Sequence, residues 1–578
     1  MPEVKFLNDG EEKSVDVPEG TLISEAIKRA GISFEFPCNG MGFCGKCLVT
    51  AKGEMEKALE DEKRFIDINK NERLACCAKV IGDTTVCLIK RDKEIKTINS
   101  GLSLNIKPDS QVKLIELGSI DFNSPVPLEE TIKYRFSTMD IYSKLAMAET
   151  LKNSGALYGV VYNNELLDIL TDKSELLAAA VDIGTTGISA YLVNTENGDI
   201  LKKISSLNPQ TEYGGDVISR INFCMKDENG TLKLQRLIVD EVNRILKELT
   251  GHLYSTDQIY NLTIAGNTTM IHLLLGLNPS SMAMAPYRPV VLNTCIFKAS
   301  EAGIIINPNG KVITLPGASA YVGADIIAGI TASGFNKMKS NAVFIDIGTN
   351  GEIAAISNGR MICTSTAAGP ALEGMNISCG CRAEKGAIES FNIDEEYNIS
   401  YTTIDDGEPA GICGSGLLDI AGNLLNKGII LESGSFNKDM DIRVISRFVE
   451  KKFFITDKIY ISQKDIRQIQ LAKGAIAAGI ISLLEKINIS IQDLEEIIIA
   501  GAFGYHINAE SILGIGLIPK GFNGKITFAG NTSIEGARLA AINQSCLAAM
   551  DKIKCEMDTL ELSMDNKFQE YFIKELNF

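Results

Sequence analysis

The chain has 578 residues, too many for one hydrophobic core, and its length predicts about three or four domains. Its formal net charge of −16 argues against a nucleic-acid partner, because no basic face is apparent that could displace counterions from phosphates. No apolar run approaches the length of a membrane span, and the opening residues MPEVK lack the apolar stretch of a signal peptide. We therefore expect a cytoplasmic protein without a membrane partner.

Residues 1–93 are predicted to form a first unit, in which cysteines stand at a distinctive spacing. A glycine-rich loop carries them as C-x5-C-x2-C, and a fourth follows after 28 residues. Four thiolates in this arrangement suit a [2Fe–2S] cluster, and the loop glycines free backbone N–H groups to point at its sulfides. Zinc is the alternative, but zinc sites usually pair cysteines two to four residues apart. The predicted ligands are Cys38, Cys44, Cys47 and Cys76.

Two neighbouring thiols need separate interpretations. Cys77 competes with Cys76 for the fourth ligand position. Cys87 lies in an apolar strand and is expected to be a small core residue.

Residues 94–112 read as a linker, because turn-forming residues punctuate a run with little periodicity. The linker is either a tether on which the cluster unit swings or an ordered connector lying on the surface. Residues 113–175 are predicted to form a small α/β middle domain, with a hairpin about Asn163-Asn164 and a helix from Met139 to Ser154. No catalytic constellation occurs in this domain.

From residue 176 onward, one pattern occurs twice: an apolar strand, an Asp, a turn with Gly and a hydroxyl or amide side chain, and a second strand. Its copies are Val181–Gly187 and Ile345–Gly351. Glycine lets the backbone approach a ligand closely, and successive N–H groups in such a turn form an anion-binding nest. Two such hairpins facing one another would clamp a nucleoside triphosphate. The residues predicted to bind ATP in these turns are Gly184, Thr185, Thr186, Gly348, Thr349, Asn350 and Gly351.

Each copy continues into helices, a further strand and a glycine loop, which indicates an internal repeat with halves at about 176–335 and 336–578. In the second half, the loops predicted to contact the nucleotide are Gly501-Ala502-Phe503-Gly504 and Gly530-Asn531. For Gly266, after the equivalent strand of the first half, nucleotide binding and a purely structural turn remain equally open.

Acidic side chains near these loops are candidates for catalysis. An Asp at a strand end can hold Mg²⁺ through water, and a nearby acid can position the attacking water. The candidates are Asp182, Asp346, Glu352, Asp216 and Asp325. For Asp216 and Asp325, a solvated helix residue or a helix cap is an equally good reading.

With these motifs in view, residues 1–93 resemble a plant- or adrenodoxin-type ferredoxin, which implies a β-grasp fold. Residues 176–578 resemble the superfamily of actin, sugar kinases and heat-shock chaperone ATPases, in which two ribonuclease-H-like domains close on ATP·Mg. The whole order is similar to that of the reductive activators of corrinoid proteins, and the stretches 208–210, 265–270 and 369–374 carry that resemblance.

This resemblance implies an α/β multidomain enzyme that uses ATP and Mg²⁺ to reduce a corrinoid protein from Co(II) to Co(I) in a methyltransferase system. It also implies an external electron donor such as a ferredoxin or flavodoxin, and a homodimer. Ser378 and Arg382, in a glycine-rich loop after the second hairpin, are candidates to face the corrinoid or the nucleotide, and a purely structural loop is an equally good interpretation. Two alternatives stay open: an ATP-coupled electron injector for another low-potential enzyme, and a redox-sensing nucleotide switch without reductase activity.

Overall fold

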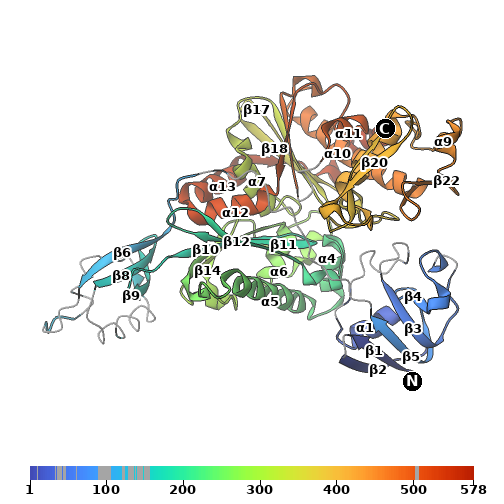
Figure 1. The fold of residues 1–578 in the computed structure, drawn as a ribbon. Coiled ribbons are helices and arrows are strands. Elements are labelled where there is room, and N and C mark those ends of the chain that lie inside the picture. Colours follow the sequence, from blue (N-terminus) through green and yellow to red (C-terminus); the bar gives the residue numbers. More distant parts are fainter. Residues whose placement is uncertain are drawn as a thin grey trace.

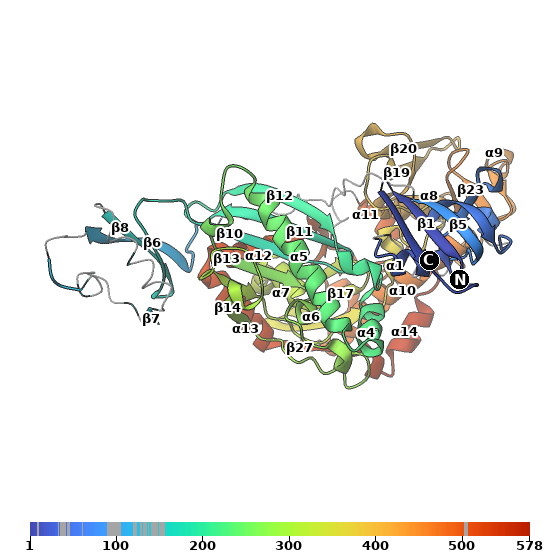
Figure 2. The same ribbon diagram turned by 90° about the horizontal axis from the view of Figure 1, so that it is seen from below.

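The structure is a computed structural model. It describes residues 1–8, 11–32, 34, 42, 47–59, 62–88, 104, 106–119, 124–127, 130, 136, 138–139, 148, 156–501 and 507–578. The chain forms several separate β-sheets (Figure 1). In a view from below, the two sheets formed by the first 170 residues lie at opposite ends of the molecule (Figure 2). Of the helices formed by the described residues, none combines the length and apolar character needed to cross a bilayer.

The N-terminal sheet has the strand order β2-β1-β5-β3-β4 and is packed against one helix. The first and last long strands, β1 and β5, pair in parallel, with Val4 opposite Thr84. Val4, Phe6 and Val86 are fully or almost fully buried in its core. This is the predicted β-grasp arrangement. Its elements are β1 (Glu3–Asn8), β2 (Glu11–Asp16), α1 (Ile23–Arg29), β3 (Leu48–Met55), β4 (Glu72–Leu74) and β5 (Val80–Leu88).

Cys87 is exposed, so the expectation that it is a core residue is wrong. Side chains alternate along a strand, and Thr84 and Val86 of β5 point into the core. Cys87 therefore lies on the opposite face.

The middle sheet has the order β6-β8-β9-β7. Asn163 and Asn164, both with positive φ, form the predicted turn between β8 and β9. Met139 does not begin a helix, as the sequence suggested, but pairs in β7 with Leu166; the rest of the expected helix lies outside the described residues except for residue 148, which is helical. The strands are β6 (Val112–Ser119), β7 (Thr138–Met139), β8 (Ala156–Tyr162) and β9 (Glu165–Leu170).

The first half of the duplicated region has the sheet order β12-β11-β10-β13-β15-β14. β10 pairs antiparallel with β11 and parallel with β13, so that the carboxyl ends of β10 and β13 meet at one edge. Its elements are β10 (Leu177–Ile183), β11 (Gly187–Asn194), β12 (Ile200–Leu207), α4 (Val217–Lys226), α5 (Gly230–Thr250), β13 (Ile259–Gly266), α6 (Thr268–Leu274), β14 (Cys295–Lys298), β15 (Lys311–Thr314) and α7 (Ala324–Ser333).

The second half repeats this order. Its sheet runs β26-β25-β16-β17-β18-β27, so that β18-β17-β16-β25-β26 corresponds to β12-β11-β10-β13-β15. The elements of this sheet and the helices after it are β16 (Ala342–Ile347), β17 (Gly351–Ser357), β18 (Arg360–Thr366), β25 (Glu496–Ala500), α11 (Ala509–Gly514), β26 (Lys525–Gly530), α12 (Thr532–Ile542), α13 (Gln544–Glu556), β27 (Met557–Thr559) and α14 (Phe568–Lys574).

An insertion between β18 and β25 carries two small sheets and the long helix α10. Its elements are β19 (Ala387–Ile393), β20 (Ile399–Thr403), β21 (Gly411–Ile412), α8 (Gly414–Asn426), α9 (Ile442–Ile445), β22 (Phe448–Val449), β23 (Lys452–Phe454), β24 (Tyr460–Ser462) and α10 (Gln463–Lys486).

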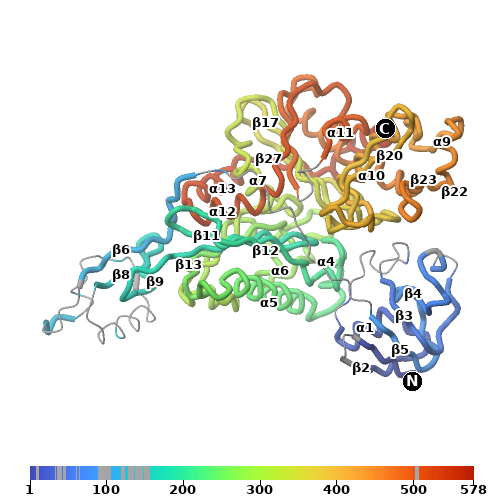
Figure 3. Tube along the Cα trace, in the orientation of Figure 1, coloured from blue at the N-terminus to red at the C-terminus, as the bar shows by residue number. Residues whose placement is uncertain are grey.

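Helices α7 and α12 lie between the two large sheets, where the chain crosses from the first half to the second and returns (Figure 3). Their side chains share one hydrophobic core with the first sheet and with Phe344 and Ala354 of the second. Glycines bring the two helices together: a Cβ atom at Gly536 would collide with the Ala328 backbone. The opposite face of the second sheet packs on a separate core with α8, α10 and α11.

Candidate nucleotide and iron–sulfur sites

Cys47 and Cys76 bring their sulfur atoms together at the N-terminal sheet. The Sγ–Sγ distance is 3.1 Å, longer than a disulfide bond and short enough for both thiolates to ligate one cluster. Both residues are buried. The Sγ atom of Cys77 lies 3.7 Å from that of Cys76. Cys38 and Cys44 lie outside the described residues, so the thiols that are described fit a [2Fe–2S] cluster, and the short distance to Cys47 favours Cys76 as the fourth ligand.

A buried ion pair fixes the strand that leads to Cys76. Arg73 donates to Glu62 through Nε (2.8 Å) and Nη2 (3.1 Å), and Glu62 also accepts from the Leu74 backbone N–H at 2.8 Å. A paired guanidinium and carboxylate have a fixed mutual geometry, so they hold β4 in place. No local pattern around Glu62 predicts this contact.

The first of the two hairpins predicted to bind phosphate, which joins β10 and β11, is held by Asn208. Its side-chain amide donates to the Gly184 carbonyl at 2.8 Å, and its backbone N–H donates to the Thr186 carbonyl at 2.9 Å. A Cβ atom at Gly184 would lie 2.7 Å from the Gly187 carbonyl oxygen, so only glycine fits this turn.

Thr185, in the same turn, is fixed by two further side chains. Asn267, which caps α6, donates from Nδ2 to Thr185 Oγ1 at 2.9 Å. The fully buried guanidinium of Arg220 donates to the carbonyl groups of Thr185 and Gly214. Burial lowers the pKa of Arg220 to about 9.

The second hairpin has a similar hydrogen-bonded turn, but more carboxyl groups lie close to it. Gly348 N–H donates to the Asn350 carbonyl at 2.9 Å and closes the turn. Thr349 Oγ1 donates to Glu373 Oε2 at 2.9 Å. A Cβ atom at Gly351 would lie 2.8 Å from Thr366 Oγ1, which explains this glycine.

Carboxyl groups from both halves gather between the hairpins. Asp346 and Glu352 are directly opposite each other on β16 and β17, an arrangement that is destabilising for two like charges. Burial, with Asp182 and Glu373 nearby, raises the pKa of Asp346 to about 7. Burial, with Asp182 and Asp346 nearby, raises the pKa of Asp325 to about 8.

The pKa of Glu352 is also raised, by burial and by Asp325 and Asp346. For Asp182 and Glu373, burial raises the pKa against the effect of their hydrogen bonds. Such a cluster is suited to a divalent cation, which would favour the ionised carboxylates. Among the described residues, no three His, Cys, Asp or Glu side chains converge closely enough to hold an ion by themselves. A divalent cation at this site would therefore need water or phosphate oxygens among its ligands.

Glycines at the ends of two equivalent strands allow the backbone to approach the neighbouring hairpin closely. A Cβ atom at Gly266, after β13, would lie 2.8 Å from the Ile183 carbonyl oxygen, and one at Gly501, after β25, would collide with the Ile347 carbonyl oxygen. The predicted adenosine-loop residues Ala502, Phe503 and Gly504 lie outside the described residues.

The third glycine loop joins the halves. Asn531, after Gly530, caps α12, and its Nδ2 lies 3.4 Å from Asp182 Oδ2. Ser533 Oγ donates to Asp182 Oδ1 at 2.7 Å. The first turn of α12 therefore holds the aspartate of the opposite half.

Other candidates have different surroundings. Asp216 caps α4, accepting from Ser219 N–H at 2.7 Å, so it has the helix-cap role that was the alternative interpretation of this residue.

Ser378 donates from its N–H (2.8 Å) and its Oγ (3.1 Å) to the buried Asp465 of α10. The Arg382 charge lowers the raised pKa of Glu373. Glu373, Asn267 and Ser533 were not among the predicted site residues.

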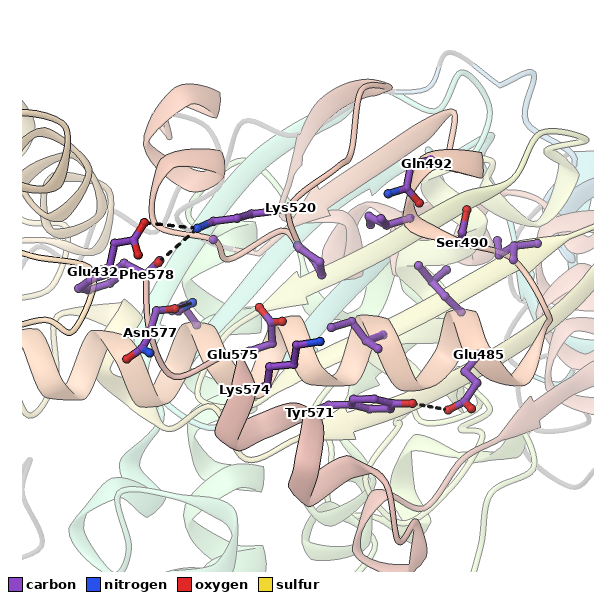
Figure 4. A pocket seen from close by; sticks show the side chains of 17 residues that line it. Glu432, Glu485, Ser490, Gln492, Lys520, Tyr571, Lys574, Glu575, Asn577 and Phe578 are labelled. Carbon is purple, nitrogen blue, oxygen red and sulfur yellow. Dashed lines mark hydrogen bonds and ion pairs between the residues drawn. The ribbon is translucent and has the colours of Figure 1, made fainter.

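A cavity of about 700 Å³ lies elsewhere in the second half, between α10, α14 and the last residues of the chain (Figure 4). The buried Lys473 donates to the Asn577 carbonyl there, and burial lowers its pKa to about 8. Lys520 and Tyr571 reach Glu432 and Glu485 across its rim. This cavity shares no residue with the carboxyl cluster.

Comparison with known families covers the parts of the chain that carry both sites. A family described as the 2Fe-2S iron-sulfur cluster binding domain matches residues 6–80, one described as the RACo middle region matches 177–338, and one described as the C-terminal domain of RACo, the ASKHA domain, matches 340–578. These matches and the observed sheets confirm the predicted fold class.

Individual relatives of the chain point to the same family. The corrinoid activation enzyme RamQ of Eubacterium limosum is 31% identical over 597 residues, covering 98% of both chains. The [Co(II) methylated amine-specific corrinoid protein] reductase of Methanosarcina barkeri is 26% identical over 69% of this chain and 76% of its own. A solved structure of a reductive activator for corrinoid, iron–sulfur protein has a TM-score of 0.71 at 29% identity, covering 100% of this chain and 98% of the other. The chain therefore belongs to the family of corrinoid activation enzymes.

Proposed function

We propose that this protein reduces the cobalt of a partner corrinoid protein from Co(II) to Co(I) in an ATP-dependent, one-electron reaction that serves a methyltransferase system. The main support is that RamQ aligns with the iron–sulfur unit and the nucleotide unit together, over 98% of both chains. The thiol pair and the duplicated phosphate hairpins thus belong to one enzyme. The electron would come from an external ferredoxin or flavodoxin, and the protein would act as a cytoplasmic homodimer.

The iron–sulfur unit would hold the electron carrier with Cys38, Cys44, Cys47 and Cys76. A [2Fe–2S] cluster of this type supplies single electrons at about −400 mV. The Co(II)/Co(I) couple is expected to lie lower, so that transfer to cobalt is uphill unless another free energy is coupled to it.

ATP can supply that coupling only by binding differently to two conformations of the protein and its partner. The nucleotide would lie between the two hairpins, where Thr185 and Thr349 offer hydroxyl groups and Asp182 and Asp346 can hold Mg²⁺ through water. Because these residues come from opposite halves, closing the halves on the γ-phosphate would reorganise both. Ser378 and Arg382, on the segment that follows Glu373, are proposed to face the partner's corrinoid or the nucleotide.

The test combines the anaerobically reconstituted protein, a reductant, Mg·ATP and a Co(II) corrinoid protein, with Co(I) followed by absorption. We expect Co(I) with ATP and none without it, and none with Asp346→Asn. If Co(I) never forms although ATP is hydrolysed, the protein is a nucleotide switch and not a reductase. Zinc in place of iron at the four thiols would also refute the proposal.

A further inference from the structure

Leu104, in the segment between the N-terminal and middle sheets, is held by a buried ion pair of α12. Its N–H donates to Glu535 Oε1 at 3.2 Å, and its carbonyl accepts from Arg538 Nη2 at 2.9 Å. The two α12 side chains pair with each other (Nη2–Oε1 2.5 Å) and are only 5% and 4% exposed. The backbone N–H and carbonyl groups of Leu104 are therefore both hydrogen-bonded to the Glu535–Arg538 ion pair of α12, which we call the clasp.

A second attachment follows a few residues later. Asp109 N–H donates to the Ile542 carbonyl at 2.9 Å, and Gln544 N–H donates to the Asp109 carbonyl at 3.0 Å. The Gln544 side chain adds a 2.7 Å bond to Asp109 Oδ2. Arg538 also donates from Nη1 to the Gly198 carbonyl at 3.1 Å, which ties the β11–β12 turn to the same clasp. The described part of this segment, residues 104 and 106–110, which we call the connector, is thus attached to the nucleotide unit at Leu104 and Asp109.

The N-terminal end of α12, close to Glu535 and opposite the attachment at Ile542, lies at the nucleotide site. Its first turn holds Asp182 through Ser533. At 1.5 Å per residue, the 11 residues of α12 span about 16 Å, and each of them is buried. A helix packed this closely, with Gly536 against the Ala328 backbone, moves as a rigid body and cannot absorb a shift locally.

We propose that Glu535 and Arg538 are positioning residues that couple the nucleotide site to the connector of the iron–sulfur unit. A nucleotide that changes the Asp182–Ser533 contact would shift α12 and, with it, the anchoring of Leu104 and Asp109. Because Leu104 is joined to β5 by the covalent chain, this anchor fixes one end of the segment that links the iron–sulfur unit to the nucleotide unit. The inference rests on the proposed function, in which that unit delivers the electron.

Arg538→Lys tests the coupling. Lysine keeps the charge next to Glu535 but lacks the planar fork that reaches Leu104 and Gly198 at once. Hydrogen exchange of residues 104–112 is measured in the full-length protein with and without Mg²⁺ and a non-hydrolysable ATP analogue. In the parent protein we expect the analogue to change the exchange rate of this segment by at least about threefold. In Arg538→Lys, exchange without nucleotide rises about tenfold and the response to the analogue is lost.

Arg443→Lys is the matched control, because Arg443 also bonds a carboxylate, Asp441, and a backbone carbonyl, that of Glu396, but contacts no connector residue. Gln544→Ala is the milder variant if Arg538→Lys does not fold; it removes only the exposed bond to Asp109 and should raise exchange there about threefold.

Functional readouts separate the coupling from the chemistry. In Arg538→Lys, ATP hydrolysis should stay within about twofold of the parent value, while Co(I) formed per ATP hydrolysed falls at least about fivefold. The inference is overturned if the nucleotide analogue leaves connector exchange in the parent unchanged, or if Arg538→Lys keeps the response. If the parent gives the exchange response but no Co(I), the proposed function fails and the coupling stands.

Discussion

Thr349 Oγ1 donates a 2.9 Å hydrogen bond to Glu373 Oε2, which places a carboxylate directly beside the second phosphate hairpin. The hydroxyl group that is predicted to meet a phosphate is thus hydrogen-bonded to a carboxylate. Nucleotide phosphates and Glu373 must compete for this hydroxyl and repel each other.

Glu373→Gln should relieve that repulsion, because the glutamine amide oxygen can still accept from Thr349 while the negative charge is gone. We expect ATP without Mg²⁺ to bind about fivefold more tightly than to the parent protein, measured by titration calorimetry. Glu396→Gln, at the exposed turn between β19 and β20, is the control. Weaker binding to Glu373→Gln would show that the carboxylate holds the nucleotide complex together.

Binding of Mg·ATP should release protons near neutral pH. The pKa of Asp346 is raised to about 7 and that of Asp325 to about 8, so both are substantially protonated at pH 7 in the nucleotide-free protein. A divalent cation favours the ionised forms and displaces these protons. Calorimetry in buffers of different ionisation enthalpy should detect the release at about pH 7 and almost none at about pH 9. Equal proton release at both values would contradict the raised pKa values.

The same shift has a consequence for stability. Asp325 and Asp346 keep their protons to a higher pH in the folded protein than in the unfolded chain. The stability that this contributes is complete below about pH 4 and is lost as the pH rises through about 7 to 8. Asp346→Asn should therefore raise the thermal midpoint of the nucleotide-free protein at pH 8 and have a smaller effect at pH 5. The exposed Asp457→Asn is the control. A larger gain at pH 5 would reverse the sign and refute the account.

Cys76→Ser should abolish the visible absorption and the paramagnetic signal of the anaerobically reconstituted, reduced protein, because Cys76 Sγ is the atom that lies 3.1 Å from Cys47 Sγ. Cys77→Ser should retain both signals. The reverse result would assign the fourth ligand position to Cys77.

Gly501→Ala should destabilise the second half by about 2–4 kcal/mol and weaken ATP binding at least about tenfold. The new methyl group would collide with the Ile347 carbonyl, at a backbone φ of +118° that L-residues rarely adopt. Gly514→Ala, in α11, places its methyl group in open space and should change the free energy of unfolding by less than about 1 kcal/mol. Similar effects of the two substitutions would show that the close approach at Gly501 is unimportant.

The parts of the fold that the sequence predicts are those with a local signal. The apolar runs that became β10, β16 and β25 end at an Asp or a Gly, and the turn at Asn163-Asn164 has the residue types its positive φ values require. The helix predicted to begin at Met139 does not begin there, because Met139 pairs with strand β9.

The site contacts that the sequence did not predict are long-range. Glu373 is 24 residues from Thr349, and Ser533 is 351 residues from Asp182. Glu373 lies in the stretch 369–374 that carries the family resemblance, but no local pattern there marks it as the partner of Thr349. Ser533 reaches Asp182 only when the two halves fold around α7 and α12. A duplicated motif reveals the hairpins but not the side chains that other segments bring to them.

The N-terminal sheet has a hydrophobic core of its own, built from residues between Val4 and Val86 and separate from the cores of the nucleotide unit. This independence makes the electron source exchangeable. A ferredoxin of different reduction potential, grafted in place of residues 1–88 and joined to the anchored Leu104, would alter the driving force and leave the ATP machinery as it is. A graded set of such chimaeras would measure how large a potential gap one hydrolysed nucleotide can bridge.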